Sequence, residues 1–119
     1  MTTAVQTLPM PPIAIEPWEW VELSAILREH LPNHPVWAFG SRATGQRVRR
    51  FSDLDLVVGG DTALPLAQRA VLHEAFDESR LPFKVDLTDL PSLAPEFRAR
   101  IAAEMILVYG PAGDSEKTA

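Results

Sequence analysis

Two aspartates one residue apart, Asp53 and Asp55, are the side chains of this sequence best suited to chemistry. Side chains alternate across a β-strand, so both carboxylates would project from one face while Leu54 and Leu56 point into a core. Like charges held so close repel each other and need a compensating cation. Carboxylate oxygens prefer Mg²⁺ or Mn²⁺, and these ions in turn hold phosphate oxygens. The pair therefore indicates a metal-dependent site for phosphate chemistry.

Residues on either side of this pair offer the other groups that transfer of a nucleotidyl group needs. Gly40 would let the backbone approach the phosphates closely, and Ser41 would offer them a hydroxyl and an N–H. Arg42 would offset the charge that develops on pyrophosphate. Asp86, on a later alternating segment, would complete a second metal site or act as a base. Asp89 competes for this role, but we expect it to lie beyond the strand end.

Three helices are expected to frame these residues. The first begins at Pro17 and stops at Pro32, the second is limited by Pro82, and the third begins at Pro95. Apolar residues at helical spacing mark them. These residues are Trp20, Leu23, Leu27 and Leu31 in the first helix, Leu64, Ala67, Val71 and Ala75 flanked by Leu72 and Phe76 in the second, and Phe97 and Ile101 in the third.

Strands are expected at residues 36–39, 53–58, 83–87 and 105–109, where apolar and aromatic residues cluster or alternate. The loop between the first two strands can open with a helical turn. Helices and strands thus alternate along the chain, which favours one sheet covered by helices over a sandwich or a bundle. The predicted fold class is α+β (mixed α/β), with one small mixed sheet.

The chain as a whole limits its partners. Its 119 residues form one domain with no room for a separate acceptor-binding domain, so we expect the second substrate on a partner protein. The net charge of −5 gives no general attraction to nucleic acid. Arg42, Arg47, Arg49 and Arg50 nevertheless gather within nine positions, where they either draw an anion or form a solvated loop.

The sequence contains no cysteine, which excludes disulfides, thiolate zinc sites and cysteine nucleophiles. It lacks a secretory signal and any apolar run of the roughly twenty residues needed to span a membrane. We therefore expect a cytoplasmic protein without membrane contact. Its composition predicts a flexible Pro-rich leader over residues 1–16, a folded domain over residues 17–109 and a mobile tail over residues 110–119.

The motif that joins the candidate residues resembles a known family signature. Phe39-Gly40-Ser41, eleven residues and then Asp53-Leu54-Asp55-Leu56 are similar to the signature of the DNA polymerase β-like nucleotidyltransferase superfamily. Residues 40–45 and Val85-Asp86-Leu87 most resemble its minimal nucleotidyltransferases (MNT), whose usual role is that of an MntA-type antitoxin to a HEPN-domain ribonuclease. The resemblance extends over residues 18–109.

This resemblance implies a nucleotidyltransferase fold, with Asp53, Asp55 and Asp86 as catalytic metal ligands and with Gly40 and Ser41 holding the phosphates of the nucleotide. It implies Mg²⁺ or Mn²⁺ as the cofactor and ATP as the donor. The implied reaction transfers AMP to a tyrosine of a partner HEPN-domain toxin. That transfer silences the toxin within a hetero-oligomer and involves no direct contact with nucleic acid.

Two other functions remain open at this point. A binding-only antitoxin would mask the toxin and keep the acidic residues as a vestigial site. A small-molecule nucleotidyltransferase would use the same site on an aminoglycoside-like acceptor. Neutralisation that survives the loss of Asp53 and Asp55 would indicate the first, and transfer to such an acceptor by the isolated chain would indicate the second.

Overall fold

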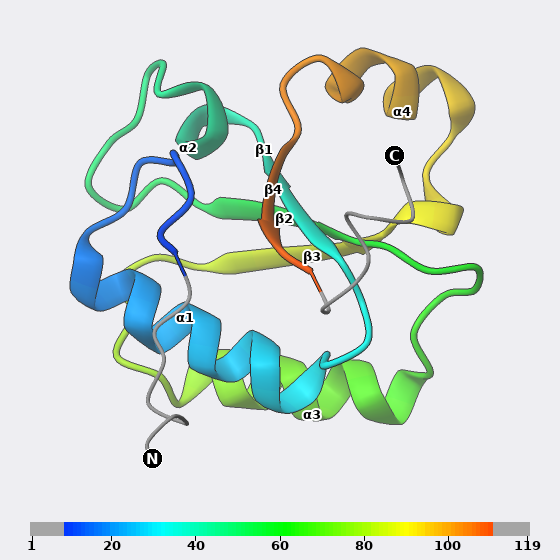
Figure 1. Ribbon diagram of the computed structural model, residues 1–119, viewed down its shortest axis with the longest axis horizontal. Helices are drawn as coiled ribbons and strands as arrows, with labels where there is room; N and C mark the ends of the chain where they lie inside the picture. Colours follow the sequence, from blue (N-terminus) through cyan, green and yellow to red (C-terminus); the bar gives the residue numbers. More distant parts are fainter. Residues whose placement is uncertain (1–8, 111–119) are drawn as a thin grey trace.

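Helices and strands alternate along the chain, as the sequence predicts (Figure 1). The computed structural model describes residues 9–110, so parts of the predicted leader and tail lie outside the described residues. The elements are α1 (Pro17–His30), β1 (Val36–Phe39), α2 (Ser41–Thr44), β2 (Leu54–Val58), α3 (Leu66–Asp77), β3 (Val85–Asp89), η2 (Leu90–Ser92), α4 (Pro95–Ala102) and β4 (Ile106–Tyr109). Within residues 9–110, no helix is long and apolar enough to cross a membrane.

The four strands form one mixed sheet in the order β3-β2-β1-β4, which confirms the predicted fold class. β1 runs antiparallel to both of its neighbours, β2 and β4. β2 and β3 are parallel, because α3 carries the chain back between them. The register pairs Phe39 of β1 with Asp55 of β2, and Asp55 in turn with Asp86 of β3. Strand β2, one of the two inner strands, therefore places Asp55 between Phe39 of β1 and Asp86 of β3.

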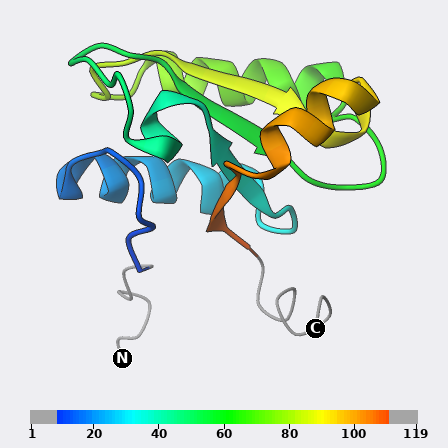
Figure 2. The same ribbon diagram turned by 90° about the horizontal axis from the view of Figure 1, so that it is seen from above.

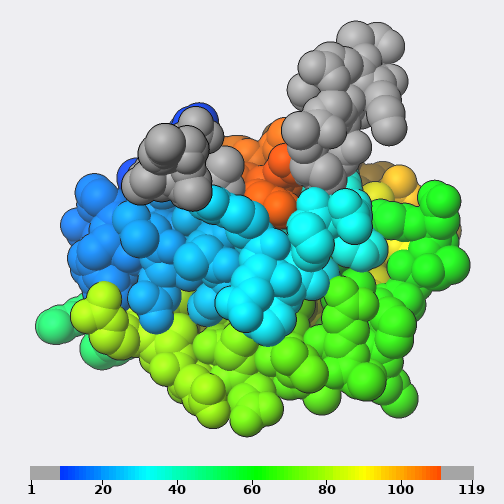
Figure 3. Space-filling model, turned by 60° about the horizontal axis from the view of Figure 1, so that its bottom comes forward, coloured from blue at the N-terminus to red at the C-terminus, as the bar shows by residue number. Residues whose placement is uncertain are grey.

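Helices α1 and α3 lie next to each other and cover one face of the sheet (Figures 1 and 2). Seen from below, α1 in blue and α3 in green form this side of the molecule (Figure 3). Burial of a leucine contributes about 1.5–3 kcal/mol, so the stripe of α1 is a main source of stability. The predicted stripe residues Trp20, Leu23, Leu27 and Leu31 are all buried, at 2% exposure or less.

The inner face of α3 differs from the predicted stripe. Leu72 and Phe76 are buried, whereas Val71 is 51% exposed and Ala67 faces solvent. Leu64 is buried but precedes the helix, which begins at Leu66. Two apolar stripes were available on this helix, and the one with the larger side chains removes more apolar area from water.

The opposite face of the sheet packs against α4. The Phe39 and Phe97 rings meet edge to face with centroids 5.9 Å apart, as aromatic pairs prefer. Val57 and Ile101 are also buried, outside the cluster that α1 and α3 cover. Figure 1 shows α4 above the sheet, on the side away from α1 and α3. This is the face that carries the odd-numbered side chains of β2, including Asp55.

The segment before α1, which the sequence assigns to a flexible leader over residues 1–16, packs against the domain at Ile13 and Ala14. Ile13 is 8% exposed. The Ala14 N–H donates to the Arg42 carbonyl at 2.8 Å, and the Arg42 guanidinium donates back to the Ala14 carbonyl at 2.7 Å. Because the backbone of this segment is bonded on both sides, residues 13–16 belong to the folded domain.

Candidate active site

Asp55 and Asp86 lie side by side on neighbouring parallel strands. They are direct partners in the β2–β3 register, so their side chains leave the same face of the sheet. Asp53 precedes β2 by one residue and is exposed, whereas Asp55 and Asp86 are half-buried. The structure thus brings together the three carboxylates that the sequence singled out.

These carboxylates gather more negative than positive charge in one small volume. Burial raises the pKa of Asp55 to about 6, and the negative charges of Asp86, Asp53 and Glu104 add to the effect. Within residues 9–110, neither Asp53 nor Asp55 forms an ion pair, and Asp86 meets only the exposed Lys84 amine at 3.8 Å. A site that holds excess negative charge in this way is suited to a cation.

The donor set matches the chemistry of Mg²⁺ or Mn²⁺, both of which prefer carboxylate oxygens. In their present rotamers, no three acidic or histidine side chains of the described residues converge on a point that could hold a metal ion. Binding of an ion by Asp53, Asp55 and Asp86 would therefore require rotation of side chains. That rotation is available, because these carboxylates are only partly buried and two of them lie directly opposite each other.

Gly40 follows β1 and touches the acidic group. A β-carbon at this position would lie 2.5 Å from Asp55 Oδ2, and the backbone has a φ of +80°. A larger residue would therefore strain the backbone and displace the Asp55 carboxylate. The Gly40 carbonyl accepts the N–H groups of Ala43 and Thr44, each at 3.0 Å, which starts α2. Ser41 is the half-exposed first residue of α2, and its hydroxyl makes no hydrogen bond within residues 9–110.

The sequence predicts that Arg42 offsets charge on pyrophosphate, but in the structure its guanidinium is bonded within the fold. Its side chain is buried and stacks on the Phe83 ring, 4.2 Å from the centroid. Burial lowers the pKa of the Arg42 guanidinium, and the charges of Glu19 and Asp53 oppose that shift. The guanidinium donates to four backbone carbonyls, those of Ala14, Arg49, Arg50 and Ser52. Arg42 therefore fastens the loop before Asp53 to the N-terminal segment.

Asp89 is the last residue of β3 and not, as predicted, beyond the strand end. Its side chain leaves the face opposite Asp86, together with Val85 and Leu87. There it is buried and forms an ion pair with Arg69 of α3, which also donates to the Leu87 carbonyl at 3.1 Å. Asp89 thus ties α3 to the sheet and takes no part in the acidic group.

Glu104 is a member of the acidic group that sequence reasoning missed. It lies in the turn between α4 and β4, and its Oε1 accepts the Gly40 N–H at 2.6 Å. Continuing the β1–β4 register two residues past Ala38 and Ile106 brings Gly40 opposite Glu104. No local pattern marks this residue, because its position depends on which strand pairs with β1.

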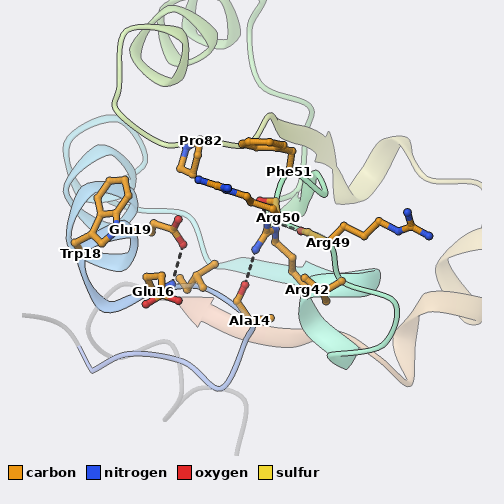
Figure 4. Close-up of a pocket in the computed structure, with 11 residues that line it drawn as sticks. Ala14, Glu16, Trp18, Glu19, Arg42, Arg49, Arg50, Phe51 and Pro82 are labelled. Atoms are coloured by element: carbon orange, nitrogen blue, oxygen red, sulfur yellow. Dashed lines mark hydrogen bonds between the residues drawn. The ribbon is translucent and has the colours of Figure 1, made fainter.

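A cavity of about 660 Å³ opens between the segment before α1 and the loop that follows α2 (Figure 4). None of Asp53, Asp55 and Asp86 lines it. Its walls come from the segment 14–19, from Arg42, from the loop 48–51 and from Pro82. In Figure 4, the Arg50 side chain extends across the cavity toward Pro82, whereas Arg49 points away. Two residues of the Arg-rich segment noted in the sequence, Arg49 and Arg50, therefore line this cavity.

Sequence comparison decides the family. The profile of the family described as "Polymerase beta, Nucleotidyltransferase" matches residues 22–112, which is well over half of the chain. The chain belongs to this family. The "Probable protein adenylyltransferase MntA" of Haemophilus influenzae is 38% identical to this nucleotidyltransferase over 96 residues, which make up 81% of this chain and 80% of the relative.

Solved structures share the fold. A chain in the crystal structure of a toxin–antitoxin with AMP-PNP superposes with a TM-score of 0.62 and is 26% identical; the match covers 81% of this nucleotidyltransferase and 77% of that chain. A second match comes from the complex of a tri-AMPylated Shewanella oneidensis HEPN toxin with its MNT antitoxin, with a TM-score of 0.57 and 23% identity. It covers 81% of this chain and 73% of the other.

Proposed function

We propose that this nucleotidyltransferase is an antitoxin that transfers AMP from ATP to a hydroxyl, that of a tyrosine, on a partner HEPN-domain toxin. The observation that carries the proposal is the group of three carboxylates, with Asp55 opposite Asp86 on β2 and β3 and Asp53 just before β2, together with the turn at Gly40 that lies against Asp55. Support also comes from the 38% identity to a relative described as a protein adenylyltransferase.

In this proposal, Asp53, Asp55 and Asp86 hold Mg²⁺ or Mn²⁺. When bound, the ion supplies positive charge that neutralises the triphosphate. The Gly40 N–H and the Ser41 hydroxyl donate hydrogen bonds to phosphate oxygens. The acceptor oxygen forms a bond to the α-phosphorus while the bond between that phosphorus and pyrophosphate breaks. One of the carboxylates, with Asp86 as the candidate, takes the proton that the acceptor hydroxyl releases.

The acceptor belongs to a second protein in this proposal. The described residues form one domain whose acidic group is reached from the face that α4 flanks. The active assembly is then a hetero-oligomer of this chain and the toxin. Because ATP is a cytoplasmic donor, the reaction would take place in the cytoplasm.

A transfer assay tests the proposal. The purified chain is incubated with a HEPN-domain protein encoded beside it, ATP labelled on the α-phosphate and Mg²⁺, and the partner is then analysed by intact mass. We expect a mass gain of AMP with the wild-type chain and none with the variant Asp53→Ala plus Asp55→Ala. Asp77→Asn, which removes an exposed carboxylate at the end of α3, is the control that should retain transfer.

One contradicting outcome of this assay and two further experiments distinguish the alternatives. Unchanged labelling by the double variant would contradict the proposed site. Toxin neutralisation in co-expression by the double variant, without any gain of AMP, would instead indicate a binding-only antitoxin. Transfer of AMP to kanamycin by the isolated chain would indicate a small-molecule acceptor.

A further inference from the structure

The Gly40 amide is already occupied by a carboxylate of this chain. Glu104 Oε1 accepts the Gly40 N–H at 2.6 Å, across 64 residues of sequence. Glu104 is half-buried at the end of the turn that follows α4, and its own N–H donates to the Ile101 carbonyl at 2.9 Å. Its backbone is therefore held in place, while its side chain bridges the gap to the end of β1.

This contact places negative charge where charge is already in excess. Glu104 is one of the groups that raise the pKa of Asp55, together with Asp86 and Asp53. Within residues 9–110, no basic side chain pairs with Glu104. Its carboxylate is balanced instead by one backbone amide, in a charge-assisted hydrogen bond of the kind that stabilises more than a neutral one.

A phosphate oxygen and the Glu104 carboxylate need the same donor. Both are anionic oxygen acceptors, and the Gly40 N–H carries a single hydrogen. Glu104 Oε1 already lies at hydrogen-bond distance from this amide, 2.6 Å from the Gly40 nitrogen. If an anionic ligand takes the Gly40 N–H, Glu104 has to leave it.

We propose that Glu104 stands in for a phosphate oxygen in the nucleotide-free enzyme and must swing away when ATP binds, so that it sets the affinity for the nucleotide. The inference rests on the proposed function, in which Gly40 binds the phosphates. Nucleotide binding is then weakened by the fraction of molecules in which Glu104 closes the amide. The hydrogen bond between the Gly40 N–H and Glu104 also keeps small anions from this amide, because they bring too little binding free energy to displace the carboxylate.

Two substitutions separate the hydrogen bond from the charge. Glu104→Gln removes the negative charge but keeps a carbonyl oxygen that can accept the Gly40 N–H. Glu104→Ala removes both the charge and the acceptor. Glu96→Gln removes an exposed carboxylate from the first turn of α4 and serves as the matched control.

The test measures the Kd of Mg²⁺–AMP-PNP by calorimetry for the wild-type chain and these variants. We expect Glu104→Ala to bind about tenfold more tightly, Glu104→Gln to show a smaller gain, and Glu96→Gln to match the wild type, because the hydrogen bond to the Gly40 N–H is lost outright in the alanine variant and is replaced by a neutral one in the glutamine variant. The Gly40 amide proton, followed by ¹H–¹⁵N NMR without nucleotide, should move upfield in Glu104→Ala and confirm that the contact has been broken.

The results distinguish this inference from the proposed function. If the wild-type chain binds AMP-PNP and neither Glu104 variant lowers the Kd, the proposed role of Glu104 is wrong. The proposed function is not affected by that result. Equal gains in affinity in the alanine and glutamine variants, with an unchanged Gly40 amide shift, would show that Glu104 acts only through its negative charge. That result would also overturn its proposed role at the Gly40 N–H. Absence of binding by the wild type and by every variant would overturn the proposed function itself.

Discussion

Gly40 and Asp55 are in contact at the end of β1, where a β-carbon on the glycine would lie 2.5 Å from a carboxylate oxygen of the aspartate. The contact arises because Phe39, the residue before Gly40, is the register partner of Asp55. The turn that would hold phosphate and the carboxylate that would hold metal are therefore built against each other. A change in one must displace the other.

Gly40→Ala is predicted to lower the rate of AMP transfer about a hundredfold. The new methyl group would push the Asp55 carboxylate from its place, and a displacement of about 1 Å at a reacting centre lowers rates by roughly that factor. The substitution also forces alanine into a φ of +80° and a ψ of −161°, a region that is essentially restricted to glycine, at a cost of about 1–3 kcal/mol in the free energy of unfolding. Labelled transfer and urea denaturation measure the two effects.

Gly45→Ala is the matched control for that prediction. Gly45 has a similar φ of +77°, but a β-carbon there would meet nothing within 4 Å. Because its ψ of 7° places Gly45 in the left-handed helical region, we expect a loss of about 1–2 kcal/mol in the free energy of unfolding, with activity preserved at temperatures where the variant is folded. Equal losses of activity in both variants would mean that backbone strain, and not contact with Asp55, explains the need for Gly40.

Asp55→Asn is predicted to stabilise the metal-free protein at neutral pH. The pKa of Asp55 is raised from 3.8 to about 6 in the folded state, so the folded chain binds this proton more tightly than the unfolded chain does. The associated stability is present below about pH 4 and is lost as the pH rises through 6. Because the carboxyl is partly exposed, we expect a difference of about 1 kcal/mol between variant and wild type at pH 7.5.

Urea denaturation in EDTA from pH 4 to pH 7.5 measures this difference. The free energy of unfolding of Asp55→Asn minus that of the wild type should increase from pH 4 to pH 7.5. Asp61→Asn, in an exposed loop, gives the baseline for the loss of one carboxylate. A difference that stays constant with pH would show that Asp55 is not strained by its neighbours.

Mg²⁺ or Mn²⁺ is predicted to stabilise the wild-type chain without nucleotide. A cation that binds only the folded state at tenfold over its Kd adds about 1.4 kcal/mol to the free energy of unfolding. Thermal unfolding against metal concentration, at constant ionic strength set with KCl, measures the gain. The same titration on Asp53→Asn plus Asp55→Asn should give no shift, and a full shift in that variant would place the metal elsewhere.

Much of the fold could be predicted because its signals are local. The prolines at positions 17 and 95 start α1 and α4, and the bounds of β1 match the expected strand. The third strand was placed two residues too early, since its alternation begins at Phe83 but β3 begins at Val85. The shared face of Asp53 and Asp55 follows from strand alternation alone, which is why the acidic group could be found first.

The residues that escaped prediction are those placed by contacts far apart in the sequence. Glu104 reaches Gly40 only because β4 pairs with β1, and strand order cannot be read from a strand's own residues. Arg42 looked like a phosphate ligand because it follows Ser41, yet its guanidinium is bound by the carbonyl of Ala14 and by the loop before Asp53. Both depend on long-range packing that propensity and periodicity do not encode.

Arg42→Met is predicted to lower the free energy of unfolding and not only the rate of AMP transfer. The methionine fills a similar volume against Phe83 but leaves four partly buried backbone carbonyls without their donor, which costs about 1–3 kcal/mol in the free energy of unfolding. Arg49→Met, at an exposed position of the same loop, should change that free energy by no more than about 0.5 kcal/mol. Urea denaturation of both variants measures the contrast. If Arg42→Met kept wild-type stability and lost only transfer, Arg42 would be a nucleotide ligand after all, because a residue that fastens the loop cannot be removed without weakening the fold.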